Sequence, residues 1–377
     1  MAEICGAGAN VNATDRHGNT ALINAAWNGD DSGMRQLIAA GADVNIANTD
    51  GDSALIKAAW SGWNGYDSCV RQLIEVGANV DVANATGYTA LIKAARWGHD
   101  LCVQQLIAAG ANINAAKRDG ATALIEAARR GHDPCTQQLI AADANVNAFD
   151  NDGETALIGA ARRGYDSCVQ QLIAAGANVD AANANGTTAL IAAALRGHDS
   201  CVRQLIAVGA NVNAAKRDGI TALIMAASDG CVSCVSQLIA AGADVNAVDQ
   251  SGDTALRIAT ALGHGSCVQQ LIAAGANVDG VDNDGNTALI LAASIGDDSC
   301  VQQLIAAGAD INIVNDDGDT AVAVAKRHGH DSCLRLLLDA GADIAAANHD
   351  GKPALFMATS RGHETCAQLL RNAGAHK

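Results

Sequence analysis

The chain has 377 residues and a formal charge of −16, with 40 acidic against 24 basic side chains. Nucleic-acid binders need a basic surface to neutralise phosphates, so this balance argues against DNA or RNA as the main partner. The sequence shows no apolar leader and no long uncharged apolar segment, which indicates neither secretion nor membrane insertion.

A glycine recurs every 33 residues along almost the whole chain, with one 36-residue step between Gly51 and Gly87. Each glycine heads a similar unit, and the series is Gly18, Gly51, Gly87, Gly120, Gly153, Gly186, Gly219, Gly252, Gly285, Gly318 and Gly351. A unit this short cannot bury its apolar face alone and must stack on copies of itself. The period therefore predicts one elongated solenoid rather than the two or three domains that the length alone would suggest.

Within a unit the pattern predicts two helices. In the unit around Gly120, Thr122 stands at the N-cap position just before an apolar run, and Leu124, Ala127 and Ala128 share one helical face. A second helix follows, and its apolar stripe is formed by Cys135, Leu139 and Ile140. The Asn- and Asp-rich segment between units is typical of a projecting hairpin turn.

The end of each second helix carries a glycine suited to a left-handed cap, as at Gly110, Gly176 and Gly209. Asp143 replaces that glycine in one unit. Asp tolerates the left-handed conformation better than most residues do, but a local weak point is expected there.

The full unit, as in residues 282–314, resembles the ankyrin repeat over nearly the whole chain. Eleven full repeats begin at Asp15, Asn48, Asn84, Lys117, Asp150, Asn183, Lys216, Asp249, Asp282, Asn315 and Asn348, and residues 1–14 match only the tail of a repeat. The family's Thr-Pro-Leu-His reads Thr-Ala-Leu-Ile here. The resemblance implies an all-α helix-loop-helix solenoid with projecting β-hairpin turns, a single array over residues 1–377. It implies a concave face lined by hairpin tips and first helices.

Ten of the twelve cysteines occupy one repeat position: Cys69, Cys102, Cys135, Cys168, Cys201, Cys234, Cys267, Cys300, Cys333 and Cys366. Equivalent positions in stacked helices lie about 10 Å apart, beyond the reach of a disulfide. These cysteines are interpreted as small core residues, buried and unpaired in a reducing, cytoplasmic environment. Cys5 and Cys231 fall outside the pattern.

Two patterns could suggest metal binding, and both have a simpler explanation. His-x-x-Cys spacing recurs, as at His99 and Cys102, but each pair offers only two of the four ligands that zinc needs. The Asp-rich tips, such as Asp316 and Asp317, lack the alternating ligands and distal Glu of a calcium loop. No catalytic constellation stands out, so the sequence predicts no enzyme activity, no metal and no cofactor.

The repeats differ from one another at the two residues before the mid-repeat glycine, which the resemblance places on the groove. Aromatic residues make up 2% of the chain, yet all four tryptophans lie between residues 27 and 97. Arginines follow in successive repeats. The predicted groove is Trp27, Trp60, Trp63, Trp97, Tyr88, Arg96, Arg129, Arg130, Arg162, Arg163 and Arg196.

Tryptophan anchors and arginines that pair with carboxylates favour a monomeric, non-enzymatic module that binds a protein or peptide, with an acidic segment as the expected ligand. A simpler interpretation stays open: the tryptophans pack against adjoining loops, and the arginines neutralise an acidic protein. The array is alternatively the recognition arm of a larger enzyme, channel or effector, or a structural spacer.

Overall fold

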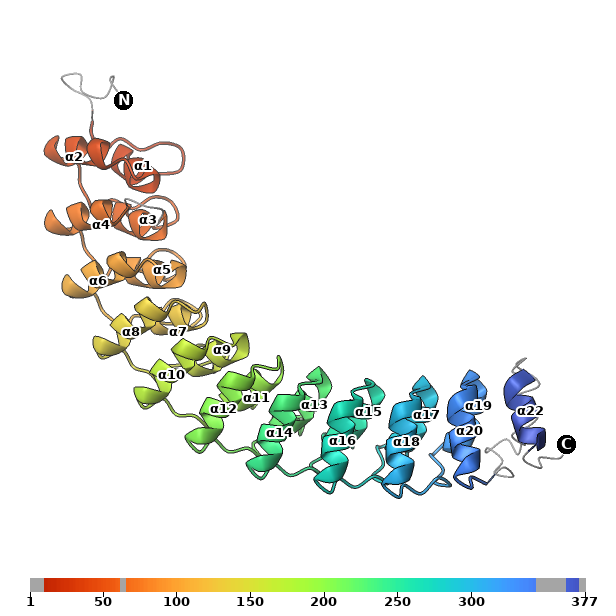
Figure 1. The fold of residues 1–377 in the computed structure, drawn as a ribbon. Coiled ribbons are helices and arrows are strands. Elements are labelled where there is room, and N and C mark those ends of the chain that lie inside the picture. The colour runs from red at the N-terminus through yellow and green to blue at the C-terminus, as the bar shows by residue number, and fades with distance from the viewer. Residues whose placement is uncertain (1–9, 62–65, 344–363, 373–377) are drawn as a thin grey trace. The chain divides into compact units, whose positions relative to one another are not determined.

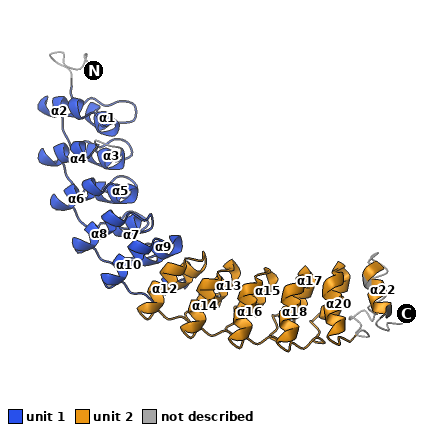
Figure 2. Cartoon of the chain, viewed as in Figure 1, with its two compact units in different colours: residues 1–189 blue, residues 190–377 orange. Residues whose placement is uncertain are grey.

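The computed structural model describes residues 10–61, 66–343 and 364–372. The chain divides into two compact units, residues 1–189 and residues 190–377 (Figure 2). Each is a succession of helix pairs, one pair per repeat, except that only α22 of the last repeat lies within the described residues (Figure 1). In the described part of the chain, every regular secondary-structure element is a helix, which confirms the predicted all-α class.

The helices of unit 1 alternate between a first and a second helix of each repeat, and they are α1 (Ala21–Asn28), α2 (Asp31–Ala39), α3 (Ala54–Ser61), α4 (Tyr66–Glu75), α5 (Ala90–Trp97), α6 (Asp100–Ala108), α7 (Ala123–Ala128), α8 (Asp133–Ala141), α9 (Ala156–Arg163) and α10 (Asp166–Ala174). Helix α11 (Ala189–Ala194) begins at the last residue of unit 1.

Unit 2 continues the same alternation, with α12 (Asp199–Ala207), α13 (Ala222–Asp229), α14 (Val232–Ala240), α15 (Ala255–Ala261), α16 (Gly265–Ala273), α17 (Ala288–Ile295), α18 (Asp298–Ala306), α19 (Ala321–His328), α20 (Asp331–Asp339) and α22 (Glu364–Asn372).

First helices begin where the sequence predicts them to begin. The hydroxyl of Thr122 accepts a hydrogen bond from the Ile125 backbone N–H at 3.4 Å, which satisfies one of the unpaired donors of the first turn. Just before the helix, one antiparallel bridge joins Ala116 to Thr122 and closes the projecting hairpin. The hairpins also bond to each other, since Asn151 donates its N–H to the Asp119 carbonyl at 2.7 Å.

The predicted apolar faces form the core. Leu124, Ala127 and Ala128 are at most 1% exposed, and the small alanines let neighbouring helices approach closely. The in-register cysteines whose side chains are described are buried and form no disulfide bond, as predicted: Cys69, Cys102, Cys135, Cys168, Cys201, Cys234, Cys267, Cys300 and Cys333. Burial raises the pKa of the Cys102 thiol to about 12, so this thiol stays protonated at neutral pH. The side chains of Cys5 and Cys366 lie outside the described residues.

Asp143 adopts the left-handed conformation that the sequence predicts for it, with φ of 61°. The equivalent Gly110 and Gly176 have φ of 80° and 81°, and nothing lies within 4 Å of where a Cβ would stand on either one. The cost at Asp143 is therefore one of backbone strain alone. We expect Asp143→Gly to raise the free energy of unfolding of unit 1 by less than about 1 kcal/mol, measured by denaturant unfolding. Destabilisation by the change would show that the Asp143 side chain makes a stabilising contact.

Candidate functional site

The described tryptophans of the predicted groove come from the first helices of unit 1. Trp27 of α1 and Trp60 of α3 pack edge to face, with ring centroids 4.9 Å apart. Trp97 is the last residue of α5. Trp27 is 40% exposed and Trp97 is 45% exposed. Trp60, which lies between them in the series, is less exposed and is half-buried. Trp63, the fourth predicted member, lies outside the described residues.

Lysines that the sequence reasoning missed lie against these rings. The Lys57 ammonium is 5.0 Å from the ring centroids of both Trp27 and Trp60. The Lys93 ammonium is 3.9 Å from the Trp60 centroid and 4.1 Å from that of Tyr88. All four distances are within the range of cation–π attraction. Lys57 and Lys93 occupy the same repeat position, directly after Thr/Ser-Ala-Leu-Ile, and comparing that position between repeats would have found them.

Arginines continue the pattern at Trp97. The Arg96 guanidinium carbon is 6.0 Å from the Trp97 ring centroid, and that of Arg130 is 5.6 Å from it. Arg96 also donates a hydrogen bond to the Tyr88 hydroxyl at 2.9 Å. Aromatic rings and basic groups thus alternate over the first helices of unit 1. Tyr88 and Lys117, which precede α5 and α7, continue the pattern, with the Lys117 ammonium 5.4 Å from the Tyr88 ring centroid. We call this surface the aromatic–basic strip: Trp27, Lys57, Trp60, Tyr88, Lys93, Arg96, Trp97, Lys117 and Arg130.

Glu126 is the counterion at one end of the strip. Its side chain is 1% exposed, and its carboxylate lies 3.0 Å from Arg96 Nη1, 3.3 Å from Lys117 Nζ and 3.7 Å from Arg130 Nε. Glu126 occupies the repeat position that Lys57 and Lys93 hold in the two preceding repeats. A single buried carboxylate therefore holds three basic groups in place.

Burial and nearby charge act differently on the two most buried lysines of the strip. Burial lowers the pKa of Lys93, and the Asp52 carboxylate opposes that shift. Burial would also lower the pKa of Lys117, but its hydrogen bond to Asp119 and the charges around it, Glu126 included, outweigh burial and raise that pKa. Lys117 therefore keeps its charge more firmly than Lys93 does.

The other predicted arginines divide into paired and unpaired groups. Arg129 Nη2 lies 2.6 Å from an Asp150 carboxylate oxygen, and Arg162 Nη2 lies 2.8 Å from one of Glu154. Arg163 is exposed in unit 1, and Arg196 is exposed in unit 2. Neither has a salt bridge with any other described residue. Arg96, Arg129, Arg130 and Arg162 thus neutralise the chain's own carboxylates, as the simpler interpretation of the arginines expects.

Histidines fix the backbone beneath the strip. His99 Nε2 lies 3.4 Å from the Trp60 carbonyl oxygen, and His132 Nε2 lies 3.1 Å from that of Arg96. A neutral ring that carries its proton on Nε2 donates to each carbonyl. These contacts hold the ends of α3 and α5, where strip residues lie. The histidine and cysteine of each His-x-x-Cys motif in this region therefore have separate structural roles.

Burial lowers the pKa of His99 and of His132 below the ordinary value of 6.5. Because the folded pKa is the lower one, the unfolded chain binds protons first as the pH falls. Stability contributed by the neutral rings is complete above about pH 6.5 and is lost as the pH falls through the folded pKa. We expect the free energy of unfolding of unit 1, followed by tryptophan fluorescence, to drop between about pH 7.5 and about pH 5.5.

The control is the double variant His99→Tyr/His132→Tyr, because Tyr165 fills this position in the next repeat. This variant should lose less stability over the same pH interval than the parent protein does. An equal loss in the two proteins would assign the pH dependence to other groups.

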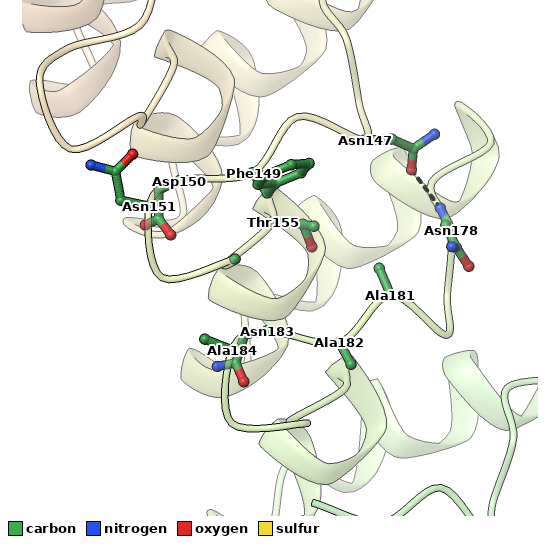
Figure 3. Close-up of a pocket in the computed structure, with 11 residues that line it drawn as sticks. Asn147, Phe149, Asp150, Asn151, Thr155, Asn178, Ala181, Ala182, Asn183 and Ala184 are labelled. Atoms are coloured by element: carbon green, nitrogen blue, oxygen red, sulfur yellow. Dashed lines mark hydrogen bonds between the residues drawn. The ribbon is translucent and has the colours of Figure 1, made fainter. Parts of the chain in front are cut away.

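An open pocket of about 920 Å³ lies between two neighbouring hairpins of unit 1 (Figure 3). Its lining includes Phe149, whose ring is 68% exposed, and Asn147, whose side chain accepts a hydrogen bond from the Asn178 N–H at 2.7 Å. The position of Phe149 holds alanine in the repeats on either side, at Ala116 and Ala182. Sequence reasoning missed this residue, although a lone aromatic at an alanine position would have indicated it.

Two other kinds of site are absent from the described residues. No group of three or more His, Cys, Asp or Glu side chains is arranged there to hold a metal ion. No helix in the described part of the chain is both long and apolar enough to cross a membrane.

A family model for ankyrin repeats, described as three copies, matches residues 22–117, 100–183, 158–249, 223–315 and 289–377. The matches together span residues 22–377, and the chain belongs to the ankyrin-repeat family. It is similar to the crystal structure of the human ASB11 ankyrin repeat domain, with 29% sequence identity and a TM-score of 0.53, over 59% of this chain and 100% of that one. A search of curated proteins found no match. The ankyrin-repeat fold is a protein–protein interaction fold, and the family is generally non-catalytic.

Proposed function

We propose that this protein is a non-enzymatic interaction module that binds a segment of a partner protein on the aromatic–basic strip of unit 1. The observation that carries the proposal is the exposure of Trp27 and Trp97, at 40% and 45%, in a chain that uses almost no aromatic residues elsewhere. Large exposed aromatic rings on the first helices of the first and third repeats, with the half-buried Trp60 between them, are an anchor surface of the kind that dominates binding energy in interfaces.

The chemistry of the strip favours a segment that carries both apolar and acidic side chains. Lys57 and Arg130 lie beside the tryptophan rings, and each also faces a carboxylate of the chain itself, Asp52 at 2.8 Å and Glu126 at 3.7 Å. Arg163 adds an exposed guanidinium without a salt bridge to another described residue. Carboxylates on the ligand would pair with these groups, and the pairing would speed association and weaken with salt. We also propose that the protein is a monomer and works in a reducing, intracellular environment.

Trp97→Ala tests the anchor role. A buried interface aromatic typically contributes about 2 kcal/mol or more to binding, so the variant should bind at least about thirtyfold more weakly. Its fold should be almost unaffected, because 45% of the side chain is exposed in the free protein. The matched control is Ile295→Ala, since Ile295 holds the same repeat position in unit 2 and is 46% exposed.

The ligand for this experiment is a peptide selected on the immobilised full-length chain from a random displayed library, with affinity measured by calorimetry. The proposal predicts that selected peptides are enriched in acidic and apolar residues. It also predicts that only Trp97→Ala weakens their binding. Peptides that bind both variants as tightly as the parent protein would refute the strip as the binding surface.

A further inference from the structure

Two cysteines with sulfur atoms in contact lie at the N-terminus of helix α14 in unit 2. Cys231 is its N-cap residue, and Cys234 lies in its first turn. The two Sγ atoms are 2.6 Å apart, and both thiols are free. A disulfide bond is about 2.05 Å long, so the two atoms need to approach by only about 0.5 Å to become bonded.

No other repeat has this arrangement. Cys234 belongs to the in-register core cysteines, and the residue three positions earlier is a histidine, a tyrosine or an aspartate in the other complete repeats of standard length, as at His264, Tyr165 and Asp297. Only Cys231 puts a second thiol there, which makes Cys231-x-x-Cys234 the one motif of this spacing in the sequence. The other in-register cysteines have no such neighbour and serve as internal controls.

The two thiols differ in access. Cys231 is half-buried and Cys234 is 0% exposed. Cys231 Sγ accepts a hydrogen bond from the Cys234 N–H at 3.2 Å, at the positive end of the α14 dipole. Burial, with the adjacent Cys231 thiol as the next contribution, raises the pKa of Cys234. A reagent from solution therefore meets Cys231 first.

We propose that Cys231 and Cys234 are an oxidation-sensitive dithiol that a small-molecule disulfide, such as oxidised glutathione, converts reversibly to an intrachain disulfide. The Cys231 thiolate attacks one glutathione sulfur and releases the other as a thiolate, which takes up the Cys231 proton. Cys234 then gives up its proton and attacks the Cys231 sulfur of the mixed disulfide, and the second glutathione leaves as a thiol. Two protein thiols are oxidised by two electrons, and one disulfide is reduced to two thiols.

Metal binding is the other chemistry that a Cys-x-x-Cys pair suggests. A structural zinc site needs four ligands, and two thiols supply half of them. Within the described residues, no third His, Cys, Asp or Glu joins this pair in a group that could hold a metal ion. The geometry therefore favours thiol–disulfide chemistry.

The test uses the native full-length chain in buffers with increasing ratios of oxidised to reduced glutathione. After acid quenching, free thiols are alkylated, and the masses of the tryptic peptides are measured by mass spectrometry. The peptide 218–257 contains Cys231 and Cys234 and no other cysteine, and the peptide 258–326 contains only Cys267 and Cys300. We expect the first peptide to lose both alkylation sites and two hydrogen atoms as the ratio rises, reversibly with a dithiol reductant. The control peptide should stay fully alkylated.

Cys231→Ser keeps an oxygen acceptor at the N-cap and removes the thiol. Cys231→Asp is the second variant, because Asp297 caps α18 in the same way. In both variants Cys234 should remain a free thiol at every glutathione ratio. Persistent alkylation of both cysteines in the parent protein, or a stable mixed disulfide at Cys231, would overturn the proposal. Equal oxidation of the control peptide would overturn it too, because unfolding would then control the reaction.

Discussion

Glu126→Gln is expected to lower the free energy of unfolding of unit 1 by about 2 to 4 kcal/mol, because the change leaves three basic groups without their shared counterion. The glutamine keeps the size of the side chain, so the loss reports charge rather than a cavity. Glu126 is 1% exposed, which favours a large effect. Arg96 and Arg130 are 28% and 37% exposed and can turn to water, which favours the lower end of the range.

Tryptophan fluorescence reports the unfolding of unit 1 in this variant, because all four tryptophans lie between residues 27 and 97. The control is Glu154→Gln, which removes one carboxylate from a single pair with Arg162, with side chains 20% and 34% exposed. Surface pairs of this kind contribute about 0 to 1 kcal/mol. Equal denaturant midpoints for the Glu126 and Glu154 variants would contradict the counterion role of Glu126.

Arg257→Ala is expected to lower the free energy of unfolding of unit 2 by about 3 to 5 kcal/mol, because it leaves two carboxylates side by side without their cation. Arg257 is 2% exposed, and its guanidinium lies 2.5 Å from both the Asp253 and the Asp282 carboxylates. Burial raises the pKa of Asp253, and Arg257 opposes that shift. The alanine would also leave a cavity where the long side chain was.

Arg257→Ile is the informative comparison, because this position carries isoleucine in most repeats, as at Ile224 and Ile290. Isoleucine fills much of the space, and the two carboxylates, at 24% and 14% exposure, can turn toward water. It should therefore cost clearly less than alanine does. Unfolding followed by far-UV circular dichroism should show the loss of stability in both variants. The unfolding transition of unit 1, followed by tryptophan fluorescence, should stay unchanged, since each repeat contacts only its neighbours. Equal losses for the two variants would contradict this account of Arg257.

Features set by local pattern were predictable from the sequence. Thr122 caps its helix, the core cysteines such as Cys135 are buried, and Asp143 is left-handed, because each depends on spacing within one repeat. The ankyrin repeats themselves were predictable for the same reason, although the matches do not establish the count of eleven full repeats.

Contacts between repeats were not predictable in the same way. The groove prediction rested on the two residues before the mid-repeat glycine, so it missed Lys57, Lys93 and the shared carboxylate of Glu126, which join the strip from another repeat position. Cys231 was recognised only as a residue outside the cysteine pattern. Its contact with Cys234 depends on the conformation of one helix N-terminus, which spacing alone does not specify.

Acrylamide quenching of tryptophan fluorescence, with and without a saturating partner segment, tests the binding surface most directly. Trp27 and Trp97 are the exposed described tryptophans, and both belong to the strip. A segment bound there covers them, so we predict that the quenching constant falls on binding and that the emission shifts to shorter wavelength. A segment that binds tightly and leaves both the quenching constant and the emission unchanged would show that it binds elsewhere.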